Sequence, residues 1–258
     1  MTTDCDRAVG LIGKARRPVA LTGAGMSQES GVPTFRGAQT GLWARYDPME
    51  LATANAFQRH PARVFGWYLW RFKLVRSVEP HSGHHALAAM AGQFDGLPVI
   101  TQNVDGLHRR AGSTDLVELH GSLEAFRCFD QGHVFDTSAL EDMEAPESGE
   151  VPPPNCATCG SPIRPGVVWF GEMLPLGAFE RAQQLVHQCD ALLVVGTSSV
   201  VYPAAALPEV AASRGVPVIE INPEETPLTS MADLWWGSSA AEALSELAEA
   251  LEAGKGHA

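Results

Sequence analysis

The sequence has few basic residues, few cysteines and no long apolar run. Its 258 residues include 18 Lys and Arg against 30 Asp and Glu, for a net charge of −12. This balance disfavours nucleic-acid binding, because neutralising phosphates needs clustered basic side chains. No apolar stretch reaches the roughly 18 residues that a membrane-spanning helix requires. We therefore expect neither a nucleic-acid partner nor a membrane partner.

The five cysteines are an odd number, and residues 1–4 lack the charged and apolar regions of a signal peptide. Both features favour a cytoplasmic chain with reduced thiols, in which a close cysteine pair binds metal rather than forming a disulfide. With 45% hydrophobic residues, the chain has enough apolar side chains to bury a large core in one or two domains. We expect a cytoplasmic monomer.

Short apolar runs alternate with helical patterns along much of the chain. The runs cover residues 18–22, 97–101, 116–119, 191–195 and 216–221. This alternation predicts an α/β fold, a Rossmann-like doubly wound parallel sheet. Two insertions interrupt it, an aromatic-rich helical module and a cysteine-containing, zinc-ribbon-like module, and together they are expected to form a small domain. The expected boundaries are 1–36, 84–122 and 171–258 for the large domain, and 37–83 and 123–170 for the small one.

The first apolar run ends at Gly23-Ala24-Gly25, where bare backbone N–H groups suit the phosphates of a dinucleotide. The sixth position of the usual G-x-G-x-x-G loop is Gln28, and Gly31 soon ends any helix, so this is not the ordinary dehydrogenase loop. Spacing alone leaves both a phosphate-binding loop and a structural turn open. Nearby, Phe35-Arg36 offers a flat ring and a guanidinium to a nucleotide.

Polar residues follow the other strands, at the edge where open parallel sheets bind ligands. Residues 102–108 follow the second strand, and His120 follows the third. A lone histidine at a strand end is either structural or catalytic. Residues 196–199 form a second nucleotide-facing loop, and the amide of Asn222 is placed to contact a ribose. The histidine run 81–85 lacks the helical spacing of a metal site, so we expect it to begin a helix capped by Ser82.

Tyr68 and Arg71 are three residues apart, on one face of an aromatic helix. They are either part of a core stripe with one snorkelling arginine or a pair that receives a carboxylate. The second interpretation has a simple chemical basis, because arginine supplies a fork of donors and tyrosine supplies an O–H.

A Cys-x-x-Cys pair at Cys156 and Cys159, with Cys128 upstream, is typical of a structural zinc site. Such a site needs four ligands, but Gln131 occupies the position three residues after Cys128 and is a poor zinc ligand. Either Asp130 or His133 completes the site, or the metal is absent or weakly held.

Read together, GAGMSQESGVPTFRG resembles the first signature of the sirtuins, the NAD-dependent protein lysine deacylases. TQNVDGLHRRAG and ELHG are similar to the second and third signatures, and Tyr68-Leu69-Trp70-Arg71 resembles the pair in sirtuins that prefer acidic acyl groups. The resemblance points to the bacterial desuccinylase-like, class III type. It implies NAD as cofactor, a structural zinc and acyl-lysine proteins or peptides as partners.

The resemblance also implies roles for individual residues. His120 is the expected general base, with an unperturbed pKa of about 6.5 that suits proton relay. The implied cofactor contacts are Gly23, Ala24, Gly25, Ser27, Phe35, Arg36, Gln102, Asn103, Asp105, Gly196, Thr197, Ser198, Asn222 and Pro223. The implied substrate contacts are Tyr68, Arg71, Val168, Trp169, Phe170, Gly171, Glu172, Val201 and Tyr202, and the implied metal ligands are Cys128, Cys156 and Cys159.

The implied reaction moves an acyl group from lysine to NAD and gives nicotinamide and O-acyl-ADP-ribose. Succinyl, malonyl, glutaryl and acetyl groups are the expected substrates. The alternatives are a predominant deacetylase and a mono-ADP-ribosyltransferase on the same scaffold. A dehydrogenase is disfavoured, since the acidic residue expected about 20 positions after the glycine loop falls in the helical insert. A non-enzymatic NAD-binding module is disfavoured by His120.

Overall fold

The computed structural model of the chain describes residues 2–33, 47–146 and 149–255. Its larger sheet has six strands in the order β3-β2-β1-β7-β8-β9, and every neighbouring pair is parallel. The strands are β1 (Pro18–Thr22), β2 (Val99–Thr101), β3 (Leu116–Glu118), β7 (Ala191–Val195), β8 (Val218–Ile221) and β9 (Leu234–Trp236). The order reverses between β1 and β7, so the predicted doubly wound sheet is confirmed, with its switch point there.

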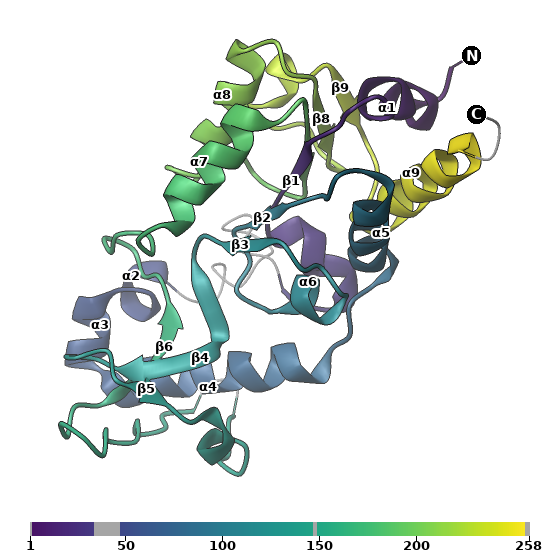
Figure 1. The fold of residues 1–258 in the computed structure, drawn as a ribbon. Coiled ribbons are helices and arrows are strands. Elements are labelled where there is room, and N and C mark those ends of the chain that lie inside the picture. The colour runs from purple at the N-terminus through teal and green to yellow at the C-terminus, as the bar shows by residue number, and fades with distance from the viewer. Residues whose placement is uncertain (1, 34–46, 147–148, 256–258) are drawn as a thin grey trace.

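Helices cover both faces of this sheet (Figure 1). On one side lie α1 (Asp4–Ile12), α5 (Ser82–Met90) and α9 (Ala240–Lys255), and on the other lie α7 (Ala178–Gln188) and α8 (Ala206–Ser213). Leu193 and Val195 pack into the first of these cores, while Leu192 and Val194 pack into the second. Both faces of β7 are therefore apolar, which explains why its sequence reads as a continuous hydrophobic run.

A second, antiparallel sheet of three strands lies in the lower part of Figure 1, in the order β5-β4-β6. It consists of β4 (Gly121–Cys128), β5 (Val134–Phe135) and β6 (Ile163–Val167). The sheet packs with α2 (Pro48–Leu51), α3 (Ala54–Arg59) and α4 (Pro61–Ser77) around a separate aromatic core. Among the described residues, the remaining short helices are η1 (Ala24–Ser30), η3 (Ala91–Gln93), α6 (Leu107–Arg110), η4 (Thr137–Leu140) and η5 (Thr229–Met231).

One local expectation is corrected. The helix cap at α5 is His81, whose Nδ1 accepts the Gly83 N–H at 3.0 Å, and Ser82 is the first helical residue. Strand β6 is a buried edge strand that ends at Val167, before the substrate contacts expected in residues 168–172. A turn follows, with Gly171 at a φ of 85°. In the described part of the chain, no helix is long and apolar enough to cross a membrane.

Candidate active site

A cavity of about 840 Å³ lies at the carboxyl edge of the parallel sheet and is lined by the loops after β1, β2, β3 and β7, by Val167 of β6 and by residues of α4. Of the predicted site residues, it brings together Gly23, Ala24, Ser27, Tyr68, Arg71, Gln102, Asn103, Asp105, His120, Val168, Trp169, Phe170, Gly171, Glu172, Gly196, Thr197, Ser198, Val201 and Tyr202. Gly25, Asn222 and Pro223 are not in its lining, and Phe35 and Arg36 lie outside the described residues. The size and the switch-point position suit a dinucleotide.

The two glycine loops that follow β1 and β7 pack directly on each other. The Gly25 N–H donates to the Gly196 carbonyl at 2.8 Å, and the Gly23 N–H donates to the Val195 carbonyl at 3.0 Å. A Cβ at Gly25 would lie 2.8 Å from the Cα of Gly196, and one at Gly23 would lie 2.8 Å from the Cα of Thr197. The N–H groups of Gly23 and Gly25 bond within the protein, so loop–loop packing explains why these two positions are glycine. A phosphate contact of the loop stays a prediction.

Beneath the first loop, Asp105 sits in a closed hydrogen-bond network. Its carboxylate accepts the Ser27 hydroxyl at 2.7 Å and the Leu107 N–H at 3.0 Å. Asn103 donates to the Gly23 carbonyl at 2.9 Å and to the Ser27 oxygen at 3.0 Å. Burial raises the pKa of Asp105, and these hydrogen bonds oppose that rise. The network therefore fixes the side chains at the floor of the cavity before any ligand arrives.

Asn222 acts on the second loop although it does not line the cavity. Its amide donates to the Thr197 carbonyl at 2.9 Å, and Gln102 donates to the Thr197 hydroxyl at 3.0 Å. The backbone carbonyl of Asn222 accepts the Trp235 indole N–H at 3.0 Å. Asn222 thus holds Thr197 from behind while Gln102 holds it from the cavity side.

His120 follows β3 and faces the cavity. Its Nδ1 lies 3.0 Å from the Gln102 carbonyl, which only accepts, so Nδ1 carries the proton and the neutral ring leaves Nε2 as the basic nitrogen. Burial lowers the pKa of His120, with the Gln102 contact opposing that shift. The imidazole is consequently in its basic form at neutral pH.

Tyr68 and Arg71, both in α4, lie in the cavity wall. Arg71 is 7% exposed, which excludes a guanidinium that snorkels to solvent. Its Cζ lies 4.8 Å from the centroid of the Trp67 ring and 5.6 Å from that of Tyr68. Burial raises the pKa of Tyr68 to about 12, so its O–H stays a donor. Trp169 packs beside it, with the ring centroids 6.1 Å apart.

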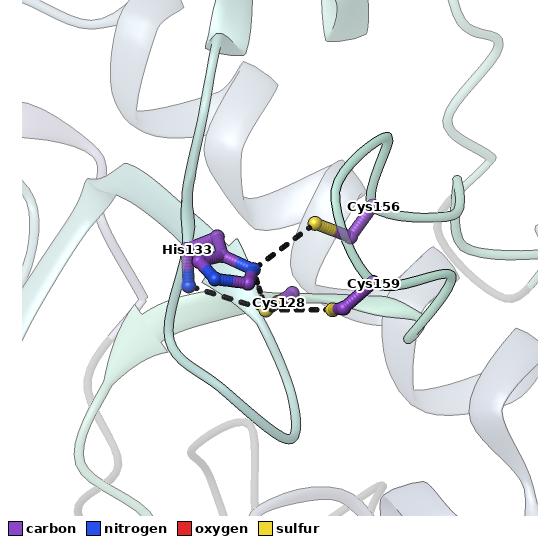
Figure 2. A group of neighbouring side chains, drawn as sticks. All are labelled: Cys128, His133, Cys156 and Cys159. Carbon is purple, nitrogen blue, oxygen red and sulfur yellow. Dashed lines mark hydrogen bonds between the residues drawn. The ribbon is translucent and has the colours of Figure 1, made fainter.

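The metal ligands form a separate cluster of Cys128, His133, Cys156 and Cys159, whose ligand atoms all lie within 4.8 Å of one another (Figure 2). His133 Nδ1 is 3.5 Å from the sulfurs of both Cys128 and Cys156, and Cys159 Sγ is 3.6 Å from Cys128 Sγ. Ligands at tetrahedral zinc are separated by about 3.5 to 3.8 Å, so this set fits zinc.

The fourth ligand position is thus filled by His133 rather than Asp130. The Cys159 and Thr158 N–H groups, with burial opposing them, lower the pKa of the Cys156 thiol to about 6, which favours a metal-binding thiolate. Strand β4 runs from beside His120 to Cys128, a length of roughly 25 Å. At that distance a bound zinc would hold the fold of the small sheet and take no part in chemistry at His120.

Some lining residues had no signal in the sequence. Ala52, Trp67 and Val104 complete the wall near Tyr68, and the loop of residues 173–177 extends the mouth. Arg164 is also unpredicted, although it is 4% exposed and lies directly behind the cavity wall. A basic residue in an edge strand gives no indication in sequence that it will be buried.

Two glycine loops at the switch point of a parallel sheet, a basic histidine at a strand end and a separate Cys₃His cluster define a class of protein: a dinucleotide-binding enzyme with a structural metal module. Residues 23–203 match the sequence model of the Sir2 family, and the chain belongs to that family.

The sequences of similar proteins align with almost the whole chain. An NAD-dependent protein deacylase of Mycobacterium leprae (strain TN) is 53% identical over 237 residues, covering 92% of this chain and 98% of that protein. One of Aquifex aeolicus (strain VF5) is 48% identical over 231 residues, covering 89% and 92%. A crystal structure of a Sir2 homologue in complex with NAD matches with a TM-score of 0.87 at 45% identity, over 96% of this chain and 94% of that one.

Proposed function

We propose that this chain is an NAD-dependent protein lysine deacylase that favours acyl groups ending in a carboxylate. Succinyl-, malonyl- and glutaryl-lysine are the preferred substrates, and acetyl-lysine is a slower one. The observation that carries this proposal is the placement of Tyr68 and Arg71, both buried, in the wall of the central cavity. We name this wall, formed by Tyr68, Arg71 and Trp169, the acyl end. The two glycine loops with Asn103 and Asp105 are the cofactor end.

The chemistry of the acyl end supports an anionic acyl group. A guanidinium in a partly dry wall attracts a carboxylate more strongly than it would in water, because the effective dielectric constant is lower. The Tyr68 O–H, whose pKa is raised to about 12 by burial, remains available as a neutral donor. Acetyl-lysine presents only a methyl group to this pair. A chain ending in a carboxylate gains charge-assisted hydrogen bonds there.

At the cofactor end, the proposed contacts to NAD come from the two loops, from Gln102 and from the network around Asp105. NAD supplies a ribose carbon that bears nicotinamide as its leaving group. His120 presents an unprotonated Nε2 to the cavity, where it accepts a proton from a ribose hydroxyl while its Nδ1–H stays on the Gln102 carbonyl. The fixed tautomer keeps the basic nitrogen aimed at the reacting groups.

Acyl-lysine proteins or peptides are the proposed partners. A Sir2 protein bound to a myristoylated histone peptide matches this chain with a TM-score of 0.80 at 32% identity, over 100% of both chains. At the cavity mouth, the side chains of Phe170 and Tyr202 are 52% and 64% exposed. Exposed rings in the lining of a cavity suit contact with a bound peptide. The division into two domains at the predicted boundaries, the monomeric state and the cytoplasmic location belong to the same proposal.

Incubating the protein with NAD and a panel of acyl-lysine peptides, with product masses recorded, tests the proposal. We expect nicotinamide, free lysine peptide and O-acyl-ADP-ribose, with succinyl or malonyl peptide consumed faster than acetyl peptide. ADP-ribose attached to protein, with no loss of the acyl group, would instead identify a mono-ADP-ribosyltransferase. Acetyl peptide consumed far faster than succinyl peptide would identify a predominant deacetylase.

A further inference from the structure

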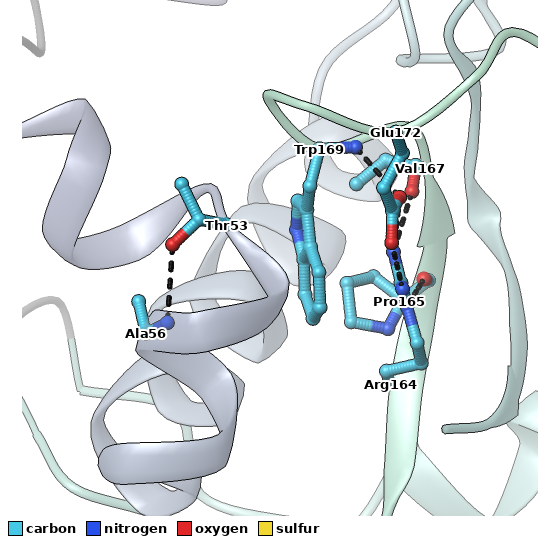
Figure 3. Close-up of polar contacts among 7 residues, drawn as sticks. All are labelled: Thr53, Ala56, Arg164, Pro165, Val167, Trp169 and Glu172. Carbon is cyan, nitrogen blue, oxygen red and sulfur yellow. Dashed lines mark hydrogen bonds and ion pairs between the residues drawn. The ribbon is translucent and has the colours of Figure 1, made fainter. Parts of the chain in front are cut away.

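Arg164, at the start of the buried strand β6, makes ionic and stacking contacts with the segment that follows it (Figure 3). Its Nη2 donates to Glu172 Oε2 at 2.9 Å and its Nη1 to Glu172 Oε1 at 2.5 Å, a two-bond fork. Nη2 also donates to the Val167 carbonyl at 3.0 Å. The guanidinium carbon lies 3.5 Å from the ring centroid of Trp169. One buried cation therefore contacts three points of residues 167–172.

Glu172 closes this segment from its other end. Its Oε2 accepts the Trp169 N–H at 2.9 Å in addition to the Arg164 contact. Burial alone raises the pKa of Glu172, but the hydrogen bonds from Arg164 and Trp169 and the positive charges of Arg164 and Arg127 outweigh it, so the pKa lies below its ordinary value. The carboxylate is thus ionised and bonded to Arg164 and the Trp169 N–H, at the cavity lining where a substrate contact is expected.

The backbone of the same segment also bonds to residues of the cavity lining. The Val168 N–H donates to the His120 carbonyl at 2.9 Å, and the Phe170 N–H donates to the Ala52 carbonyl at 2.9 Å. The Trp169 side chain, 1% exposed, packs on Phe57 with ring centroids 5.4 Å apart. Phe57 lies in α3, which begins after Thr53, whose hydroxyl accepts the Ala56 N–H (Figure 3).

We propose that Arg164 and Glu172 are positioning residues that set the shape of residues 168–171, the segment offered to the peptide, without touching the substrate. The inference rests on the proposed function only in taking this segment as a peptide contact. The pair's effect extends to every acyl peptide, because the peptide-facing backbone that it holds is common to all of them, although Arg164 also stacks on Trp169 of the acyl end. We expect it to leave NAD binding unchanged, since the proposed NAD contacts lie in loops that follow the parallel strands.

The test uses Glu172→Gln and Arg164→Lys in the full chain, with Arg63→Gln as a matched control. Glu172→Gln keeps the size of the side chain and an acceptor for the Trp169 N–H but removes the charge. Arg63, in α4, forms an ion pair with Glu50, in α2, at 2.8 Å, and the two side chains are 44% and 55% exposed. KM and kcat are measured for acetyl and succinyl peptides and for NAD.

We expect the peptide KM to rise about tenfold or more in both variants, for acetyl and for succinyl peptides. The KM for NAD should stay within about twofold of wild type, and Arg63→Gln should change neither constant. A purely structural ion pair would instead lower the active fraction, and hence kcat, without moving the peptide KM. That result in Glu172→Gln would overturn the proposal.

If Arg164→Lys does not fold, Glu172→Gln decides alone, because the Glu172 side chain is 24% exposed and its replacement is isosteric. Hydrogen exchange of the Trp169 amide, whose N–H bonds to Glu172, should then be faster in Glu172→Gln than in wild type. An unchanged peptide KM with unchanged exchange would refute the assignment. A wild type that prefers acetyl peptide would refute the proposed acyl preference and leave this comparison measurable.

Discussion

At the cofactor end of the cavity the walls are backbone loops held by short hydrogen bonds, whereas at the acyl end they are large side chains from separate helices and strands. Gly23 and Gly196 belong to loops that follow neighbouring strands of one sheet. Tyr68 comes from α4 and Trp169 from the turn after β6. The cofactor end depends on the parallel sheet itself, and the acyl end depends on how the small sheet and its helices pack.

This contrast suggests that the cofactor end supports the reaction itself and that the acyl end sets the selectivity for the acyl group. The backbone loops and the Asp105 network leave little freedom to substitute, since a Cβ at Gly23 or Gly25 would collide with the neighbouring loop. The acyl wall is made of side chains, and side chains exchange without rebuilding a sheet. Changes at the cofactor end should therefore affect every acyl substrate alike, whereas changes at the acyl end should alter which acyl group is removed.

The largest expected effect lies between the two ends, at His120. Replacing it in His120→Ala removes the basic nitrogen from the cavity, and we expect turnover to fall roughly a hundredfold or more for every acyl peptide. Binding of ADP-ribose, measured by calorimetry, should survive, because the loops are untouched. Turnover equal to wild type would refute the role of His120 as base.

The next effect concerns the metal module, which lies in the small sheet. We expect His133→Ala to weaken zinc binding by at least about tenfold and to lower the melting temperature, since a tetrahedral site loses its fourth ligand. Zinc content by mass spectrometry and thermal unfolding measure this. Asp130→Asn is the matched control, because Asp130 lies outside the cluster. Full zinc content in His133→Ala would rule out His133 as a ligand.

A further expected effect is an acid sensitivity beneath the cofactor end. His108 Nε2 lies 2.9 Å from the Thr22 hydroxyl, and its ring centroid is 4.9 Å from that of His84. Burial, with a smaller contribution from neighbouring histidines, lowers the pKa of His84 to about 2 and that of His108 to about 4. Both values lie below the unfolded pKa of about 6.5.

Stability from these two rings is therefore complete above pH ~6.5 and is lost as the pH falls toward 4, because the unfolded chain binds more protons. Each ring should contribute a slope of about 1.4 kcal/mol per pH unit in that window. Chemical unfolding at pH 7 and pH 5 measures the total, and His84→Asn should flatten the slope. A free energy of unfolding that stays constant between these pH values would contradict the assignment.

The parallel sheet and the polar clusters were predictable because each strand, and each cluster that follows a strand, is formed by contiguous residues of the sequence. A buried strand followed by Gly23-Ala24-Gly25 already marks both the strand and the loop. The reason for the glycines was not predictable, because the contact between Gly25 and Gly196 depends on how two distant loops meet. Sequence spacing located the loop, but it did not indicate that the N–H groups of Gly23 and Gly25 bond to carbonyls of the neighbouring loop.

Ligand choice and buried charge needed the tertiary structure. The sequence left Asp130 and His133 as equal candidates, and the β4–β5 hairpin decides between them, since the Cys128 N–H bonds to the His133 carbonyl at 2.9 Å. Arg164 was missed because its burial and its ion pair depend on Glu172 and Trp169, which the turn after β6 folds back over it. Spacing placed Tyr68 and Arg71 on one face of a helix but left a core stripe open, and the family resemblance pointed to a substrate pair. Both residues line the cavity, and their contact with an acyl group stays a prediction.

The measurement that tests acyl recognition most directly is the ratio of kcat/KM for succinyl peptide to that for acetyl peptide, in wild type and in Arg71→Met. Losing a charge-assisted pair costs about 1.5 to 3 kcal/mol, so we predict that the ratio falls by roughly ten- to a hundredfold while deacetylation stays nearly unchanged. Tyr68→Phe should lower the ratio in the same direction. A wild type that favours acetyl peptide, with Arg71→Met lowering both activities equally, would contradict the account and make Arg71 a structural arginine.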